Sequence, residues 1–307
     1  MIMRDIKISL SIFSLQRAYG DMEALRIAKE SGADAVDFNT DEKNRFDYRN
    51  AESVYSRSDE EIVRYFSGIK AYADQLGICI CMTHGRLAGF KNDPDEDEAL
   101  IENIRRDLLA AKTLGAPVCV IHAVSTMHMG PDCDPELMHQ LNFDMYTRVL
   151  PFARQYGVKI ATETFGAVNR YRCCDFFGNM NEFIRSCQRV WENNADKEYF
   201  TVCVDTGHTN TASRFHNNPS PGDAIRMLGK NTSVLHLHDN DTYSDQHKIP
   251  LTGSIDWEDV FGALDEIGYD GYYNLELTLS WFGNNFMKES AAFAVKMMRN
   301  YISSRKE

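Results

Sequence analysis

The sequence repeats one short pattern, in which an amphipathic, helix-like stretch ends in a glycine and a short apolar run follows within a few residues. A glycine just past a helix end adopts the left-handed conformation that closes the helix, so each repeat predicts a helix, its C-cap and a strand. Six such glycines recur: Gly32, Gly77, Gly115, Gly157, Gly229 and Gly268. The apolar runs after them are 35–38, 78–83, 118–121, 158–162, 233–237 and 271–277.

Two further strands complete the series. The interval between Gly157 and Gly229 is about twice the others, and within it Asn193 and Asn194 precede the apolar run 199–205. Asparagine is the usual substitute for glycine at a helix C-cap, so this is the seventh junction. With 6–12 as an opening strand, eight strands alternate with helices. Three helix starts carry expected caps: Ser58 with Glu61, Asp134 before Pro135, and Ser220 before Pro221.

Strands that alternate with helices predict a parallel sheet with right-handed crossovers, and eight units in about 300 residues match a closed (β/α)₈ barrel of the α/β class. An open doubly wound sheet is the alternative. Such a sheet usually has a G-x-G-x-x-G turn after its first strand, and residues 11–16 read SIFSLQ instead. No linker-like segment interrupts the pattern, so we expect one TIM-barrel domain over residues 1–307.

Composition excludes several classes of protein. Hydrophobic residues make up 43% and charged residues 25%, as in globular domains, and the net charge of −12 disfavours nucleic acid and anionic membranes as partners. No apolar run is long enough to span a membrane, and residues 1–5 lack the apolar core of a secretory signal, so we expect a cytoplasmic protein. The eight cysteines form no C-x-x-C pair and are expected to be reduced; Cys79, Cys81, Cys119 and Cys203 should act as small hydrophobes. A homo-oligomer is possible.

Six successive predicted strands end in a residue that can bind a metal or carry a proton: His84, His122, Glu163, Asp205, His236 and Glu276. In this type of barrel, chemistry is built at the C-terminal ends of the strands. Several buried carboxylates at one barrel mouth are costly unless a cation neutralises them. The pattern therefore predicts one divalent metal ion, and the mostly oxygen ligands suit Mn, Mg or Co, with Zn also possible.

Side-chain alternation supports this cluster. In 158–163 the β-branched residues take the helix-facing positions, which turns Glu163 into the barrel, and the same parity turns Asp205, His236 and Glu276 inward. His238 shares this parity but falls two residues beyond the expected strand end, so we place it in a loop or at the rim. His128, His139 and His216 are expected at the surface.

At these residues the chain resembles the xylose-isomerase-like TIM-barrel superfamily, which contains sugar phosphate isomerases and epimerases together with AP endonuclease family 2. The resemblance covers nearly the whole chain and is most specific from the sixth to the eighth strand. Its motifs are Asp205-Thr206-Gly207-His208, His236-x-x-Asp239, Asp245-x-His247, Gly253-x-Ile255-Asp256-Trp257 and Glu276. It implies a metal held by Glu163, Asp205, His236 and Glu276. It also implies that Glu163 and Glu276 transfer the proton and that His208 binds substrate hydroxyls.

The endonuclease branch is similar at more positions. Its trinuclear zinc site would map onto nine residues: His84, His122, Glu163, Asp205, His208, His236, Asp245, His247 and Glu276. A zinc phosphodiesterase of this kind must neutralise several phosphates, and the net charge of −12 argues against it. We therefore interpret His84, His122, His208, Asp245 and His247 as substrate-binding residues or as ligands of a second metal.

The leading interpretation is a metal-dependent sugar isomerase or epimerase acting on a small-molecule sugar. Three alternatives stay open: a lyase or C-glycoside-cleaving enzyme on an oxidised sugar, the zinc phosphodiesterase, and a non-catalytic sugar-binding role. The loops after the seventh and eighth strands offer Lys248 and no glycine-rich phosphate cradle, which favours an unphosphorylated sugar.

Overall fold

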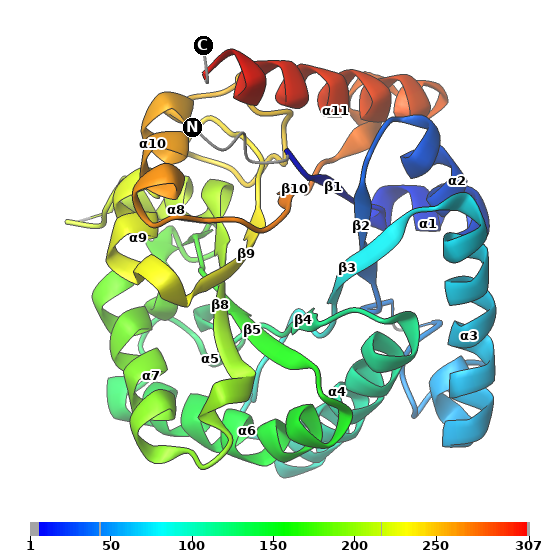
Figure 1. The fold of residues 1–307 in the computed structure, drawn as a ribbon. Helices are drawn as coiled ribbons and strands as arrows, with labels where there is room; N and C mark the ends of the chain where they lie inside the picture. Colours follow the sequence, from blue (N-terminus) through cyan, green and yellow to red (C-terminus); the bar gives the residue numbers. More distant parts are fainter. Residues whose placement is uncertain (1–5, 43, 216, 306–307) are drawn as a thin grey trace.

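The computed structural model describes residues 6–42, 44–215 and 217–305. It is a TIM barrel, with eight parallel strands enclosed by helices, as the sequence predicts (Figure 1). The barrel strands are β1 (Ile8–Ser11), β2 (Ala35–Asn39), β3 (Cys79–His84), β4 (Val118–Val120), β5 (Lys159–Glu163), β8 (Phe200–Asp205), β9 (Thr232–His236) and β10 (Tyr273–Leu275). Their hydrogen-bonded order is β10-β1-β2-β3-β4-β5-β8-β9, so the strands follow one another around the barrel in chain order.

The two ends of this sheet meet beside the C-terminal ends of the strands. Leu237, the residue after β9, bridges to Leu275 of β10, and its N–H donates to the carbonyl of Asn274 at 2.8 Å. The Glu276 N–H in turn donates to the Leu237 carbonyl at 3.2 Å. This closure fixes Glu276 next to the residues that follow β9.

Eleven α-helices lie in the described part of the chain. They are α1 (Phe13–Tyr19), α2 (Asp21–Glu30), α3 (Asp59–Leu76), α4 (Pro94–Leu114), α5 (Thr126–Met129), α6 (Pro135–Tyr156), α7 (Met180–Asn193), α8 (Thr206–Ser213), α9 (Pro221–Leu228), α10 (Trp257–Glu266) and α11 (Met287–Ser304). The predicted N-caps Ser58, Asp134 and Ser220 are present, and all six predicted glycines have positive φ. Asn194 ends α7 as expected, but its φ of −105° is extended, and its side-chain oxygen accepts from the Asp196 N–H instead.

The core has two parts. A large apolar cluster fills the space between the strands and the helices, and a smaller one lies among the strands. Cys81 and Cys203 belong to the smaller cluster and Cys119 to the larger, as predicted, whereas Cys79 is exposed, with its Sγ 3.2 Å from the Tyr272 hydroxyl. All eight cysteines are free thiols.

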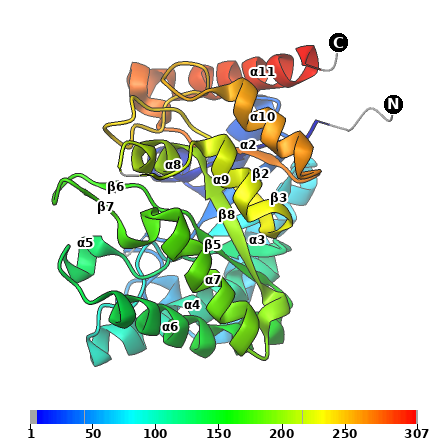
Figure 2. The ribbon, with the colours of Figure 1, turned by 90° about the vertical axis from the view of Figure 1, so that its left-hand side faces the viewer.

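Two features differ from the sequence prediction. Between β5 and α7 an antiparallel hairpin forms from β6 (Ala167–Val168) and β7 (Cys173–Cys174), and it projects beyond the body of the barrel (Figure 2). Strand β4 ends at Val120, two residues before His122. None of the described helices is both long and apolar enough to cross a membrane.

Candidate metal centre

Four side chains from four neighbouring strand ends converge at the mouth of the barrel. Glu163 and Asp205 end β5 and β8, His236 ends β9, and Glu276 directly follows β10. The His236 Nδ1 lies 3.2 Å from Glu163 Oε1 and 3.4 Å from Glu276 Oε2. One ligand atom of each of the four side chains lies within 4.8 Å of the others. The predicted metal ligands are therefore brought together.

His236 shows why a cation fits this cluster. Its side chain is fully buried, and neither ring nitrogen has a hydrogen-bond partner among the described residues. A buried polar atom without a partner is costly, and here Nδ1 faces two carboxylates. On the other side of the ring, Nε2 lies 3.6 Å from Oδ2 of Asp37, a buried residue of β2. An ion bound at Nδ1 would satisfy that nitrogen, and the two carboxylates would supply the oxygen ligands.

Two more histidines surround Glu163. The His122 Nε2 lies 3.0 Å, and the His84 Nε2 3.4 Å, from Glu163 Oε2. His122 lies beyond the end of β4, yet its N–H donates to the Arg86 carbonyl at 2.9 Å, which holds the segment after β4 against the loop after β3. Both residues predicted as substrate-binding or second-metal residues thus lie next to the main cluster.

A second group of possible ligands lies nearer to solvent. His208, in the first turn of α8, places Nε2 3.4 Å from Asp245 Oδ2, and His247 places Nε2 3.1 Å from the same oxygen. His208 Nδ1 is also 3.3 Å from Glu163 Oε1, so this group adjoins the first one. The nine candidate residues therefore form one continuous cluster, in which Asp205 and His236 are fully buried.

His238 is a functional candidate that lies in a loop, as predicted, but whose burial was not predicted. It follows the end of β9, as expected, but it is fully buried and not at the rim. Its Nε2 lies 3.0 Å from Asp205 Oδ2, and its ring stacks on His247 with centroids 3.8 Å apart. A Cβ at Gly207 would lie 1.9 Å from this ring, so the glycine makes room for it. The signal was available in the inward parity that His238 shares with His236.

The remaining three histidines, His128, His139 and His216, were all predicted at the surface. His128 is exposed, as predicted. The prediction for His139 was wrong, because it is buried on α6 with its Nε2 2.8 Å from the Glu182 carboxylate. His216 lies outside the described residues.

Neighbouring groups hold Glu163, His84 and His247 in their charged forms. Burial alone would raise the pKa of Glu163, but His236 and His122 hold it well below its usual value. Burial would lower the pKa of His84 and His247, but Glu163 raises the first to about 9 and Asp245 raises the second to about 10. Protons on His84 and His247 thus offset part of the carboxylate charge.

A cavity of about 500 Å³ opens above this cluster. Glu163, Glu276, His208 and His247 line its floor and sides, and Phe13 contributes an apolar wall. Among the described residues, Arg17 of α1 is the one arginine or lysine that lines it. The cavity therefore suits a small polar molecule and offers little positive charge.

Comparison with known proteins defines the family. Residues 25–300 match the family model described as xylose isomerase-like TIM barrel, and the chain belongs to this family. An uncharacterised protein of Methanocaldococcus jannaschii is 27% identical over 177 residues, which are 57% of this chain and 56% of the relative. An uncharacterised protein of Sinorhizobium fredii is 24% identical over 210 residues, or 67% of this chain and 61% of the relative. The matches thus span less than two thirds of either relative.

Solved structures share the fold over nearly the whole chain. A D-tagatose 3-epimerase-like protein superposes with a TM-score of 0.73 at 19% identity, covering 97% of both chains. The D-psicose 3-epimerase of Clostridium cellulolyticum, solved with D-tagatose, has a TM-score of 0.71 at 17% identity, covering 96% of this chain and 99% of the epimerase. The IolI protein, solved with a zinc atom, has a TM-score of 0.70 at 20% identity, covering 97% and 99%.

Proposed function

We propose that this protein is a metal-dependent sugar isomerase or epimerase, formed by one domain over residues 1–307. The observation that carries the proposal is the buried His236 Nδ1, which has no hydrogen-bond partner within the described part of the chain and faces the carboxylates of Glu163 and Glu276. Membership of the xylose isomerase-like family supports it, as do the epimerases among the proteins of similar fold.

Glu163, Asp205, His236 and Glu276 would hold the metal. A divalent ion there supplies polarisation of a substrate carbonyl and its neighbouring hydroxyl, which acidifies the shared C–H. Mn, Co, Mg and Zn are all compatible with three carboxylates and one imidazole.

Glu276 is placed to take that proton, because its side chain retains 18% exposure and lines the cavity. Returning the proton to the neighbouring carbon on the same face isomerises the sugar; Glu163, returning it from the opposite face, would epimerise it. His208, also in the cavity lining, binds a substrate hydroxyl.

Solvent exchange tests this proposal. The metal-loaded protein is incubated in D₂O with D-fructose, D-tagatose, D-psicose and D-glucose, and NMR follows the hydrogen next to each carbonyl. We expect exchange in at least one sugar. Bound metal and bound sugar without any exchange would reject catalysis by proton transfer and favour a sugar-binding role.

A second candidate, a zinc phosphodiesterase, is favoured by the group of His208, Asp245 and His247, which could hold a further metal. With Arg17 as the one cation in the cavity lining, the described site offers little to bind a nucleic acid backbone. Hydrolysis of bis(p-nitrophenyl) phosphate by the zinc-loaded protein, lost in His247→Gln, would support this candidate.

A further inference from the structure

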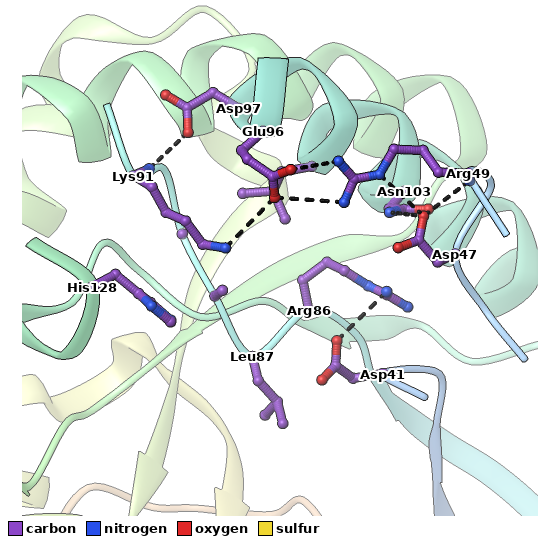
Figure 3. Close-up of a pocket in the computed structure, with 13 residues that line it drawn as sticks. Asp41, Asp47, Arg49, Arg86, Leu87, Lys91, Glu96, Asp97, Asn103 and His128 are labelled. Atoms are coloured by element: carbon purple, nitrogen blue, oxygen red, sulfur yellow. Dashed lines mark hydrogen bonds and ion pairs between the residues drawn. The ribbon is translucent and has the colours of Figure 1, made fainter. Parts of the chain in front are cut away.

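Figure 3 shows a second cavity, of about 250 Å³. Its walls come from the loops after β2 and β3, from the N-terminal half of α4 and from His128 of α5. Leu87, in the loop after β3, lines both this cavity and the one above the metal centre. We call this space, lined by Asp41, Arg49, Arg86, Ala88 and Lys91 among others, the adjoining cavity.

Close packing fixes the wall of the adjoining cavity. At Gly89 a Cβ would lie 2.4 Å from the Val124 nitrogen, so this loop rests directly on the backbone of the segment after β4. Three residues earlier in the loop, the buried Arg86 donates from Nε and Nη2 to the two Asp107 oxygens of α4, at 2.8 and 3.0 Å. The cavity is therefore shaped before any ligand enters it.

Donors and acceptors alternate around the adjoining cavity. On one side, Arg86 Nη1 lies 3.5 Å from Asp41 Oδ1. On the other, Glu96 lies between two cations, 2.6 Å from Arg49 Nη1 and 3.7 Å from Lys91 Nζ (Figure 3). These charged groups are thus each close to one of opposite sign, whereas Asp97 accepts from the backbone N–H of Lys91 at 2.7 Å.

The charge balance argues for the kind of ligand. Four carboxylates and three cations line the adjoining cavity: Asp41, Asp47, Glu96 and Asp97 with Arg49, Arg86 and Lys91. This balance disfavours an anion, since each of the three cations lies within 4 Å of a carboxylate. A hydroxyl group both donates and accepts, so a neutral group with several hydroxyls matches this lining.

We propose that the adjoining cavity binds a second sugar ring, so that the substrate is a glycoside and not a free monosaccharide. The reacting sugar would lie above the metal centre and its glycosyl substituent would pass Leu87. This inference rests on the proposed function and adds the substrate class to it.

Binding of matched sugars tests the inference. Isothermal titration of the metal-loaded protein would compare D-fructose with four glucosyl-fructoses: turanose, maltulose, leucrose and isomaltulose. These carry the same glucosyl group at different fructose hydroxyls, so one linkage should direct it past Leu87. We expect at least one to bind about tenfold or more tightly than D-fructose.

Two substitutions assign that gain to the adjoining cavity. Ala88→Trp fills the space, and Arg49→Gln, on a side chain that is 44% exposed, removes a charge with little risk to folding. Either should bring the ratio of disaccharide to fructose affinity close to one. Ala71→Trp, at an exposed site on α3, is the matched control and should keep the gain.

The outcomes separate the two proposals. Glucosyl-fructoses that bind no better than D-fructose, or a gain that survives both substitutions, would overturn the second sugar site and leave the metal-dependent chemistry standing. If neither D-fructose nor any of the disaccharides binds, both the sugar substrate and the second site are overturned.

Discussion

Glu276 is the residue on which the proposed chemistry depends most. It combines contact with His236 at 3.4 Å with access to the cavity. Glu276→Gln keeps the size of the side chain and removes the base, so we expect turnover to fall by about 100-fold or more while the protein stays folded. Exchange kinetics and circular dichroism would measure the two effects.

Glu289→Gln is the matched control, because Glu289 is exposed on α11 and does not line the cavity. It should keep full turnover. A Glu276→Gln protein as active as this control would remove Glu276 from the mechanism.

His238 is expected to position a ligand. Its contact with Asp205 Oδ2 at 3.0 Å orients that carboxylate, and residues of this kind typically contribute 10- to 100-fold to metal affinity. We expect His238→Gln to weaken metal binding by about that factor, and His236→Ala to abolish it. Competition with a chromogenic chelator would measure both.

His139→Gln is the control, because His139 is a buried histidine on α6, and it should leave the metal affinity unchanged. A larger effect of His238→Gln than of His236→Ala would make His238 the metal ligand and contradict the assignment.

At the scale of elements, alternation along the strands was enough to predict which side chains meet. Glu163, Asp205 and His236 each end a strand where the sequence places it. The burial of His238 was not predicted, because it depends on the closure between β9 and β10 and on the space left by Gly207. Such contacts join segments that are distant in the sequence, so no local sequence pattern predicts them.

The segment between β7 and α7 shows the same limit. Asp175 accepts hydrogen bonds from the Ser125 hydroxyl at 2.7 Å and the Thr126 N–H at 2.9 Å, which ties this segment to α5. The strands β6 and β7 have two residues each, which is too short for an apolar alternation that would predict them. Tertiary contacts, not local propensity, select their conformation.

Asp175 also gives the protein a defined pH dependence. Burial raises its pKa to about 6, although its hydrogen bonds with Ser125, Phe177 and Thr126 oppose the shift. In the unfolded chain the pKa is about 3.9, so the native state holds the proton more tightly. Its contribution to stability is therefore present below about pH 4 and is lost as the pH rises through about 6.

Asp175→Asn should remove this contribution. We expect the free energy of unfolding of the wild type, relative to the variant, to fall by up to about 3 kcal/mol between pH 4 and pH 7. Urea denaturation across this range would measure it, with Asp95→Asn as an exposed control. A difference that does not change with pH, or that grows as pH rises, would contradict the assignment.

At the scale of the whole molecule, the barrel could be predicted because each repeat of helix, glycine and strand is encoded by neighbouring residues. The adjoining cavity could not be predicted, because most of its walls come from loops whose paths depend on packing against one another. The family match and the similar structures agree with the predicted fold over nearly the full chain.

Metal binding should stabilise the whole barrel. A cation that binds the folded chain alone adds about 2.7 kcal/mol at a hundred times its Kd. We expect a chelator to lower Tm by several degrees and added metal to restore it, as measured by calorimetry. An Asp205→Asn protein should show little response, and an equal response in both proteins would place the stabilising ion elsewhere.

The metal content of the purified protein tests the central claim most directly. Elemental mass spectrometry on protein prepared without chelator, in wild type and in Asp205→Asn, would count the ions per chain. We predict about one Mn, Co, Mg or Zn per wild-type chain and a loss of that ion in the variant. Two or three zinc ions per chain would favour phosphoester hydrolysis, and a wild-type protein that retains no divalent metal even after loading would contradict the account.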